Sequence, residues 1–328
     1  MPTLRDFIHT QFVLKIPKPT ASFTGKTVIV TGATGGIGKE TAQHIARLGA
    51  SKVILGCRSQ SRGNSAKSEI ESLLKCSPST IEVWELDIES PPSIKAFAER
   101  ANKLPRLDVL INNAGIQSAK FKAVYDTERT IGVNVIGTFL LALQLVPKLK
   151  ETARKYGATP HMTFVTSALY DIAKYPKEDG GDIFAWFGDE SHFDAMNQYS
   201  LSKLLQLYAV IKLSAIVDPA DTTAPDPIVI NSLDPCFCKT GLARELEGGL
   251  KVGYRVFEAV AARTPEEGAR LVVQAASAGR ETHGLYLRAG AVRVYVGNAS
   301  DEKKAAHVWD LLCGKLEGLQ PGILQNLK

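Results

Sequence analysis

The chain has 328 residues, of which 45% are hydrophobic, which is enough for one large globular domain or two ordinary ones. The net charge of +5 comes from Lys and Arg residues that are scattered among Asp and Glu, without the long basic block of a nucleic-acid-binding arm. We therefore expect a solvated surface and no nucleic-acid partner.

The cysteines and the N-terminal residues exclude further classes of protein. Five cysteines, at 57, 76, 236, 238 and 313, form no pair of C-x-x-C motifs and have no histidine at metal-ligand spacing. We expect free thiols, a reducing cytoplasmic environment and no metal site. Residues 1–22 are apolar in part, but charges and the prolines Pro17 and Pro19 break them into pieces too short for a signal peptide or an integral membrane span. They predict an arm packed on the outside of the domain, with a peripheral membrane contact as the alternative.

From residue 23 to the end, short β-rich runs alternate with longer helical patterns. This order predicts a single α/β domain in which helices cover both faces of a parallel sheet of about seven strands. The expected strands are 28–30, 52–57, 81–88, 107–115, 162–167, 227–233 and 284–287. The expected helices are 38–48, 65–75, 127–149, 199–217, one that opens at 264, and 301–316.

A glycine-rich turn joins the first expected strand to the first expected helix. Gly32, Gly36 and Gly38 follow the spacing T-G-x-x-x-G-x-G, with Thr34 and Ile37 between them. A phosphate can approach the backbone where side chains are absent, and the first turn of a helix offers unpaired N–H groups and a positive dipole end. The turn predicts a phosphate site, although a purely structural turn is the alternative.

The residues after the second expected strand indicate which dinucleotide would bind. Arg58 follows Cys57 where a dinucleotide fold meets the adenosine ribose, and no acidic residue is there to favour a free 2′-hydroxyl. A guanidinium can pair with a 2′-phosphate, so the sequence favours NADP over NAD. Arg62 is a second candidate for this phosphate, and an ordinary surface arginine is the alternative.

Polar residues at the ends of later strands form a second group. Asn112 and Asn113 end an apolar strand, and amides in that position need hydrogen-bond partners. Ser167 ends the fifth expected strand, where ligands bind in open α/β sheets. Tyr199 and Lys203 are four residues apart, on one face of a helix, where an ammonium can stabilise a phenolate and lower the pKa of the phenol.

Together the glycine spacing, the run Asn112-Asn113-Ala114-Gly115 and the Ser167, Tyr199 and Lys203 set resemble the short-chain dehydrogenase/reductase family. From about residue 23 the chain is most similar to the retinol-dehydrogenase-like branch, including its fungal members that tailor secondary metabolites. The resemblance implies a Rossmann-type, three-layer α/β/α fold. It also implies NADP(H)-dependent interconversion of a ketone or aldehyde and an alcohol.

The same resemblance assigns roles to single residues. Tyr199 would exchange a proton with the substrate oxygen, Ser167 would orient that oxygen, and Lys203 would lower the pKa of the tyrosine and hold the ribose. Asn134 would hold a local helix irregularity and anchor a water relay. Further cofactor contacts are expected from Asp87, Ile88, Asn113, Ala114, Gly115, Pro235 and Thr240. For Asp87, a cap on the next helix, through Ser90 and Pro91, is the alternative or an additional role.

Two segments are expected to cover the substrate, near 168–198 and 241–262. The aromatic residues of the first segment and the apolar residues of the second predict a pocket for a bulky, apolar small molecule. The candidate lining residues are Phe184, Trp186, Phe187, Phe193, Cys236 and Leu242. The alternative for the first segment is an outer insertion with its own small core.

One residue departs from the family pattern. Cys236 stands where the family usually has glycine, and its side chain could crowd the nicotinamide or narrow the pocket. This departure favours an alternative function, an NADP-binding protein with a non-redox role such as a cyclase or a cofactor sensor. Members of the family often pair through their long helices, so a homo-oligomer is also expected.

Overall fold

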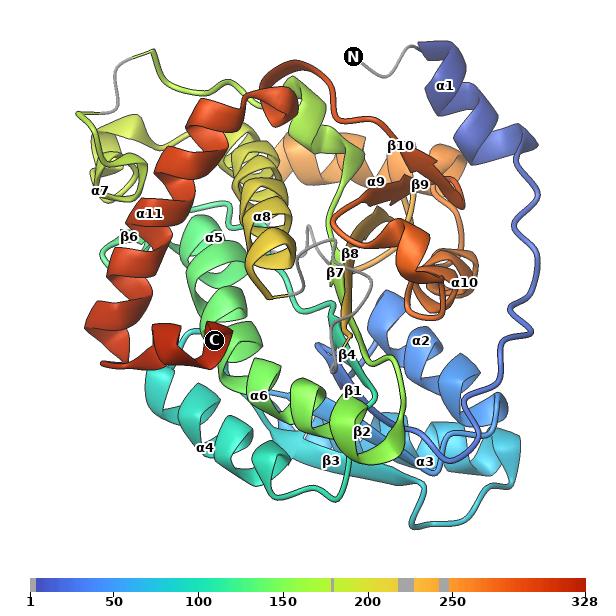
Figure 1. Cartoon of the computed structure of the whole chain (residues 1–328). Coiled ribbons are helices and arrows are strands. Elements are labelled where there is room, and N and C mark those ends of the chain that lie inside the picture. Colours follow the sequence, from blue (N-terminus) through green and yellow to red (C-terminus); the bar gives the residue numbers. More distant parts are fainter. Residues whose placement is uncertain (1–3, 178–179, 218–226, 242–247) are drawn as a thin grey trace.

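The protein is described by a computed structural model that covers residues 4–177, 180–217, 227–241 and 248–328 (Figure 1). Its centre is an eight-stranded sheet in the order β10-β9-β8-β7-β4-β1-β2-β3. The strands are β1 (Thr27–Thr31), β2 (Lys52–Cys57), β3 (Ile81–Glu85), β4 (Val109–Asn112), β7 (His161–Val165), β8 (Val229–Asp234), β9 (Tyr286–Arg288) and β10 (Ala291–Arg293).

Seven of these strands are parallel, and they correspond to the seven predicted from the sequence. The eighth, β10, turns back at the edge and pairs antiparallel with β9. In the centre of the sheet β1 lies between β2 and β4, with Val28 opposite both Val53 and Val109. All the carboxyl ends of the parallel strands therefore meet along one edge of the sheet.

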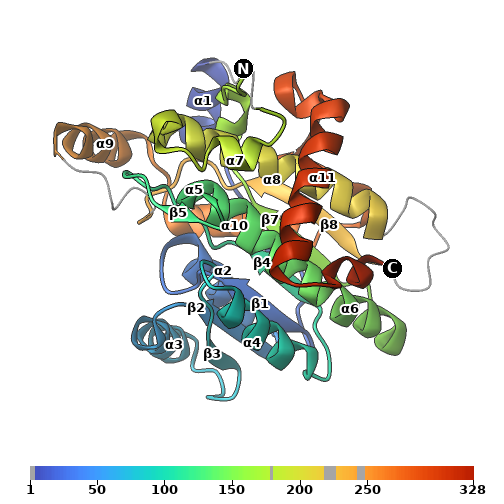
Figure 2. The ribbon, with the colours of Figure 1, turned by 90° about the vertical axis from the view of Figure 1, so that its left-hand side faces the viewer.

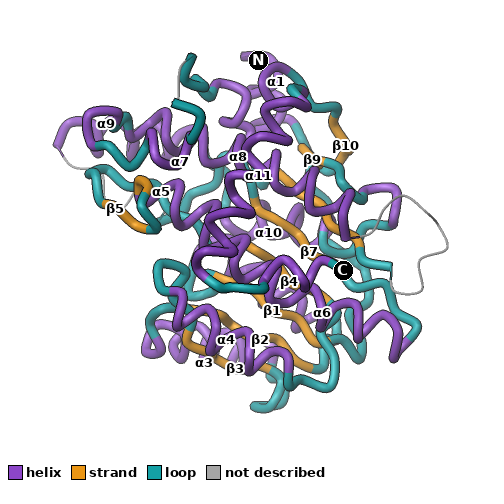
Figure 3. The backbone as a smooth tube through the Cα atoms, turned by 60° about the vertical axis from the view of Figure 1, so that its left-hand side comes forward, coloured by secondary structure: helices purple, strands orange, loops and turns teal. Residues whose placement is uncertain are grey.

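Helices cover both faces and give the predicted three layers (Figure 1). One face carries α2 (Gly36–Arg47), α3 (Gln60–Leu74) and α10 (Pro265–Ala275); the other carries α4 (Pro91–Asn102), α6 (Thr138–Tyr156) and α8 (Ala195–Val217). In the tube view of Figure 3 the strands run through the middle of the molecule between these helices. Alternate residues of β1 feed two separate cores: Ile29 packs on the α6 and α8 side, whereas Val28 and Val30 pack on the α2 side.

The long helix in front of the sheet differs in detail from the predicted span 127–149. Thr127 and Glu128 form the short strand β6 (Thr127–Glu128), which pairs with β5 (Ala123–Val124). The helix begins as α5 (Arg129–Ile131), widens into the π-helical segment η2 (Gly132–Gly137) and continues as α6 to Tyr156. The buried side chain of Glu128 accepts a hydrogen bond from the Ile131 N–H and caps this start, which explains the later onset.

Other boundaries shift for similar local reasons. Helix α3 begins five residues earlier than predicted, since Ser59 caps it by accepting a hydrogen bond from the Arg62 N–H. Helix α8 begins at Ala195, where Asp194 accepts from the N–H groups of Met196 and Asn197. The predicted cap at Thr264 is confirmed as a capping box with Glu267.

Two described helices are long and apolar enough to cross a membrane by length and composition, Arg129–Tyr156 and Ala195–Val217. Their most apolar windows are 94% and 78% buried inside the fold, so both are core helices that pack on the sheet.

The remaining elements lie around this layered body. The N-terminal residues form α1 (Leu4–Ile8) and a π-helical turn, η1 (His9–Val13), and then run along the surface to Phe23. Figure 2 shows α1 and α9 (Gly248–Ala261) at the same end of the molecule, with α11 (Glu302–Leu319) crossing over α8. Short helices complete the chain: η3 (Ala168–Ile172), α7 (Ile183–Trp186), η4 (Glu190–His192), η5 (Arg280–Thr282), η6 (Gly297–Ser300) and η7 (Ile323–Leu327).

Candidate active site

The glycine turn lies between the carboxyl end of β1 and the start of α2. Gly32 and Gly36 have φ values of +67° and +55°, the left-handed region that favours glycine. A Cβ on Gly38 would lie 2.5 Å from Asn113 Nδ2 and 2.7 Å from the Gly32 carbonyl oxygen, so only glycine lets the helix start this close to the strand. Position 35, the N-cap, carries no side chain to cap α2, and its Cβ direction is open. The first N–H groups of α2 therefore face an open cradle suited to phosphate.

The Asn113 amide holds this turn against the neighbouring strand. Its Nδ2 donates to the carbonyl oxygens of Thr31 (2.8 Å) and Gly32 (3.4 Å). The Thr31 hydroxyl accepts from the backbone N–H groups of Asn113 (3.0 Å) and Ala114 (2.9 Å). Of the two amides that the sequence predicts to need partners, Asn113 ties the end of β4 to the glycine turn. Neither polar atom of the buried Asn112 side chain has a hydrogen-bond partner among the described residues.

Thr240 approaches the same turn from the loop after β8. The nearest atoms to a Cβ built on Gly36 belong to Thr240, at 3.7 Å. The fold therefore brings Thr240, more than 200 positions away in the sequence, to the turn with Gly36.

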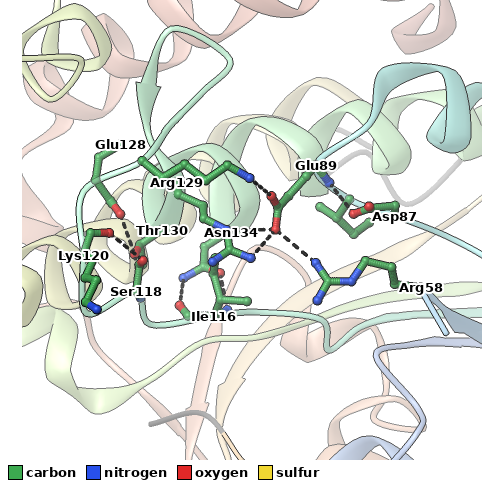
Figure 4. A network of polar contacts seen from close by, with 12 residues as sticks. Arg58, Asp87, Glu89, Ile116, Ser118, Lys120, Glu128, Arg129, Thr130 and Asn134 are labelled. Atoms are coloured by element: carbon green, nitrogen blue, oxygen red, sulfur yellow. Dashed lines mark hydrogen bonds and ion pairs between the residues drawn. The ribbon is translucent and has the colours of Figure 1, made fainter. Parts of the chain in front are cut away.

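The predicted adenosine end is formed by residues after β2 and β3 (Figure 4). The Arg58 side chain is 47% exposed, and its Nη1 lies 3.4 Å from Glu89 Oε1. Arg129 holds the same carboxylate more tightly, donating to Glu89 Oε1 from Nε (2.9 Å) and Nη2 (2.6 Å). Lys122 adds a third cation at 3.3 Å. Burial raises the pKa of Glu89, but the hydrogen bonds and charges of Arg129 and Lys122 outweigh it and leave the pKa below its usual value. The contact of Arg58 with this carboxylate is longer than the contacts of Arg129.

Asp87 and Ile88 lie in the turn that follows β3. Asp87 Oδ1 accepts a hydrogen bond from the Glu89 N–H (3.0 Å), whereas Ser90 is the residue that caps α4. The alternative that Asp87 caps the next helix is therefore wrong. Asp87 stabilises the turn, and Ser90 caps α4. Tyr125 donates to the Ile88 carbonyl and fixes the same turn from the other side.

Ser167 and Tyr199 meet at the carboxyl end of β7. Ser167 caps η3, accepting from the Leu169 N–H, and its side chain lies near the phenol of Tyr199. Burial raises the pKa of Tyr199 above its usual value, and the proximity of the Ser167 side chain opposes this rise. The nearby buried carboxylate of Asp234 raises the pKa of the phenol further.

Lys203 lies one helical turn after Tyr199, with its ammonium 5.7 Å from the centroid of the tyrosine ring. Its Nζ donates to the Val165 carbonyl (3.0 Å) and to Gln206 Oε1 (3.2 Å). Burial lowers the pKa of Lys203 to about 8. In this arrangement Lys203 is not among the groups that shift the Tyr199 pKa, so a lowering of that pKa by Lys203 stays a prediction.

Asn134 sits in the π-helical segment, as the resemblance implied that it would hold a helix irregularity. Its Oδ1 accepts from the Ile116 N–H (2.9 Å), and its Nδ2 donates to the Ile116 carbonyl and to Ser202 Oγ, both at 3.0 Å. Ser202 Oγ in turn donates to the Tyr199 carbonyl (2.7 Å). The amide therefore links the loop after β4 to the helix that carries Tyr199, and Figure 4 shows its contact with Ile116.

Cys236 occupies the turn after β8. Its φ is +66°, so the backbone keeps the left-handed conformation that a glycine would take there. The side chain is buried, and burial raises the pKa of its thiol to about 12. Burial raises the pKa of Asp234, and the nearby N–H groups of Ala168 and Cys236 oppose this rise. Asp234 thus lies near both the segment that follows Ser167 and this turn.

The predicted lining residues of segment 168–198 do not all reach a pocket. Phe184 and Phe187 are buried in the core on the α6 and α8 side, with Lys315 of α11 over the Phe184 ring, so their assignment to a pocket wall is wrong. Trp186 stacks on His192 within the segment. Phe193 is partly buried and meets Phe121 edge to face. The rings of Phe184, Trp186 and Phe187 pack into or against the main core, so the alternative of an outer insertion with its own small core does not describe them either. Leu242 lies outside the described residues.

Several residues of the site escaped sequence reasoning. Glu89 and Ser202 have no spacing that marks them, because their partners Arg129 and Asn134 come from other elements. Gln206 lies three residues after Lys203 on the same helix, and that spacing could have indicated it. Leu169 and Met196 are exposed apolar side chains two residues after Ser167 and three before Tyr199, and this proximity in sequence could have indicated them.

Comparison with known proteins agrees with this geometry. The sequence model of the family described as "short chain dehydrogenase" matches residues 26–167. The short chain dehydrogenase/reductase dmxR8 of Cryptosporiopsis sp. is 36% identical over 98% of this chain and 99% of its own length. The short chain dehydrogenase atnD of Emericella nidulans is 37% identical over 92% of this chain and 95% of its own.

Solved structures support the fold. A short-chain dehydrogenase/reductase from Caenorhabditis elegans, solved with cofactor, superposes with a TM-score of 0.62 at 20% identity, covering 82% of this chain and 95% of its own. A short chain dehydrogenase from Shigella flexneri, complexed with NADP, gives 0.58 at 20% identity over 83% and 99%. With relatives above 30% identity along almost the whole length, this chain belongs to the short-chain dehydrogenase/reductase family.

Proposed function

We propose that this oxidoreductase uses NADP(H) to interconvert a ketone or aldehyde and an alcohol on a bulky, apolar small molecule. The observation that carries the proposal is that the Ser167 side chain and the Tyr199 phenol lie together beside the buried Lys203 ammonium, at the edge of the sheet where the glycine turn also lies. Membership of the family gives the reaction class, and the named residues give the mechanism.

The residues present fit a dinucleotide phosphate. The open cradle at Gly35 and Gly36 offers uncapped N–H groups to the pyrophosphate, and Thr240 stands beside it. Arg58 would turn from its long contact with Glu89 to a 2′-phosphate, forming a stronger charge-assisted pair. Asp87, Ile88, Ala114, Gly115 and Pro235 would complete the contacts.

A bound nicotinamide would supply or accept the hydride. Burial raises the pKa of Tyr199 above the already high value of a phenol, so the side chain is protonated at neutral pH and can give its proton to a carbonyl oxygen during reduction. Ser167, which lies near the phenol, would donate a hydrogen bond to the same oxygen and hold it within reach.

Lys203 and Asn134 would support this transfer. The Lys203 side chain is a mixture of charged and neutral forms near its pKa of about 8, and in its charged form it would hold the ribose and stabilise a tyrosinate. Asn134 fixes the backbone at Ile116 and, through Ser202, the backbone carbonyl of Tyr199, and it would anchor the water relay.

The substrate class follows from the apolar residues near Ser167 and Tyr199. Leu169 and Met196 expose apolar side chains, and Phe193 is partly buried beside Phe121. These surfaces support a bulky hydrophobic substrate. By the resemblance to fungal tailoring enzymes, we place the reaction in secondary metabolite biosynthesis, in the cytoplasm, with a homo-oligomer as the working form.

The test is absorbance of NADPH with a panel of bulky ketones and aldehydes, and of NADP with the matching alcohols. We expect Tyr199→Phe to lower turnover by about 100-fold or more, since general acid–base catalysis typically contributes 10²–10⁴. Undiminished turnover by Tyr199→Phe would remove the mechanism. NADPH bound tightly, with a substrate converted without redox change, would instead support the cyclase or sensor alternative.

Cofactor choice has its own test. Arg58→Ala should lower the preference for NADP over NAD, with Arg100→Ala, an exposed arginine on α4, as the matched control. An unchanged preference in Arg58→Ala would show that another group, such as Arg62, meets the 2′-phosphate.

A further inference from the structure

The N-terminal arm precedes the match to the family model, which begins at residue 26, yet it is firmly held to the body of the protein. The buried guanidinium of Arg263 donates to the carbonyl oxygens of Thr10 (2.7 Å) and Leu14 (2.5 Å). Arg270 of α10 donates to the Ile16 carbonyl (2.6 Å). Two arginines from the end of α9 and from α10 thus bind three backbone carbonyls of the arm.

The same Arg263 holds the loop after β8 through its backbone. Its N–H donates to the Phe237 carbonyl (2.8 Å), and its carbonyl accepts from the Lys239 N–H (2.9 Å). Phe237 lies between Cys236 and Cys238, in the run from Pro235 to Thr240, which by the family resemblance would contact the carboxamide and the pyrophosphate of the cofactor. Arg263 therefore joins the arm to this loop directly.

Gln11 of the arm makes a second connection to the same peptide. With its amide in the orientation that satisfies both atoms, the buried Gln11 side chain accepts from the Phe237 N–H (2.9 Å) and donates to the Phe237 carbonyl (3.2 Å). The Gln11 amide thus pairs with the Phe237 backbone as a neighbouring strand would. The arm contacts both the N–H and the carbonyl of Phe237.

Aromatic rings extend the connection to α9. Phe7 of the arm stacks on Phe257 of α9 (ring centroids 5.9 Å apart), and Phe257 stacks on Phe237 (5.1 Å). Tyr254 of α9 meets the Phe237 ring edge to face at 6.0 Å. The arm, the loop and the helix expected to cover the substrate therefore share one packed cluster around Phe237.

We propose that the N-terminal arm is a clamp that positions the 235–240 loop against the nicotinamide half of the cofactor, with Gln11 and Arg263 as its positioning residues. The inference rests on the proposed use of NADP(H). The glycine turn and Arg58 are themselves held by contacts to β4 and Glu89 that do not involve the arm, so we expect the clamp to act mainly on the nicotinamide half.

The experiment compares two ligands in direct binding titrations, NADPH and adenosine 2′,5′-bisphosphate, which carries the adenosine half alone. In Gln11→Ala we expect the Kd for NADPH to rise about three- to tenfold. This rise corresponds to about the net free energy of a single hydrogen bond. The Kd for the bisphosphate should stay unchanged. Phe12→Ala, the neighbouring exposed residue of the arm, is the matched control and should alter neither.

A second readout needs no cofactor. Cys236 and Cys238 flank Phe237 and are buried, so loosening the loop should speed their labelling by N-ethylmaleimide, measured peptide by peptide. Buried Cys57, on β2, serves as the internal reference and should label at the parent rate.

The outcomes separate the two proposals. A parent protein that binds neither ligand would overturn the use of NADP(H), and labelling of Cys236 and Cys238 would then decide the clamp alone. A parent that binds both, with Gln11→Ala weakening both equally or neither, would overturn the clamp. Unchanged labelling of both flanking thiols would also overturn it.

Discussion

The glycine turn offers the sharpest test of how the sequence builds the cofactor site. In Gly38→Ala the new methyl group would lie 2.5 Å from Asn113 Nδ2 and 2.7 Å from the Gly32 carbonyl oxygen. Real Cβ atoms essentially never approach this closely, so either α2 or the Asn113 amide must move. The Asn113 amide cannot move without losing its 2.8 Å bond to the Thr31 carbonyl.

The expected cost combines three effects. Overpacking costs about 1–3 kcal/mol, and losing the Asn113 hydrogen bond adds about 1 kcal/mol. The higher helix propensity of alanine returns about 1 kcal/mol. We therefore expect Gly38→Ala to lower the free energy of unfolding by about 1–3 kcal/mol, or roughly 2–4 °C in melting temperature.

The assay is thermal unfolding followed by circular dichroism, with NADPH titration on the same samples. Gly35→Ala is the stability control, because no described atom lies within 4 Å of its Cβ direction and its φ of 175° suits any residue. Gly38→Ala should also bind NADPH more weakly, since the start of α2 is displaced from the phosphate cradle. A Gly38→Ala protein as stable as Gly35→Ala, with the affinity of the parent, would refute this account of the turn.

Three further predictions address single residues. Cys236→Gly should keep the free energy of unfolding within about 1 kcal/mol of the parent, because relief of the left-handed backbone offsets the lost buried thiol. Cys236→Val should lose about 1–3 kcal/mol in urea unfolding. Equal free energies for the two variants would contradict backbone strain at this position. Since the pKa of Lys203 is lowered from 10.5 to about 8 on folding, the unfolded chain binds more protons between these values. The free energy of unfolding of the parent should therefore rise with pH across this window relative to that of Lys203→Met. Parallel curves of free energy of unfolding against pH would refute the pKa shift. Asn134→Ala should lose about 2–4 kcal/mol by leaving both backbone groups of Ile116 without their partner, and a loss under about 1 kcal/mol would mean that water replaces the amide.

The fold was predictable to a large extent because its signals are local. Apolar runs such as Lys52–Cys57 read as buried strands, and the structure has β2 at these same bounds. The errors fall at ends that side chains decide: Glu128 delays the long helix, and Ser59 starts α3 early. A capping side chain affects only the first turn of its helix, where it competes with the helix propensity of the neighbouring residues. A hydrophobic pattern spread over ten residues therefore does not reveal it.

The site was predictable where the chemistry needs fixed spacing along one element. Tyr199 and Lys203 share a helix face, and the glycines share one turn, so their proximity follows from the chain itself. The prediction of the pocket wall was wrong because the residues that cover its side chains are distant in the sequence. Phe184 and Phe187 are aromatic, as pocket-lining residues often are, but α11 and the core cover them. The residues near them in the sequence do not indicate that α11 packs there.

The sequence by itself predicted the succession of strands along the chain and the glycine turn, because each depends on spacings of a few residues. It also placed Tyr199 and Lys203, which we propose to be catalytic, on one helix face. Only the tertiary structure decided which distant groups meet. It placed Thr240 beside Gly36 and Glu89 between Arg58 and Arg129, and it fixed Phe237 to Gln11. Such contacts join residues 30 to more than 200 positions apart, and they arise from the packing of layers that no local pattern encodes.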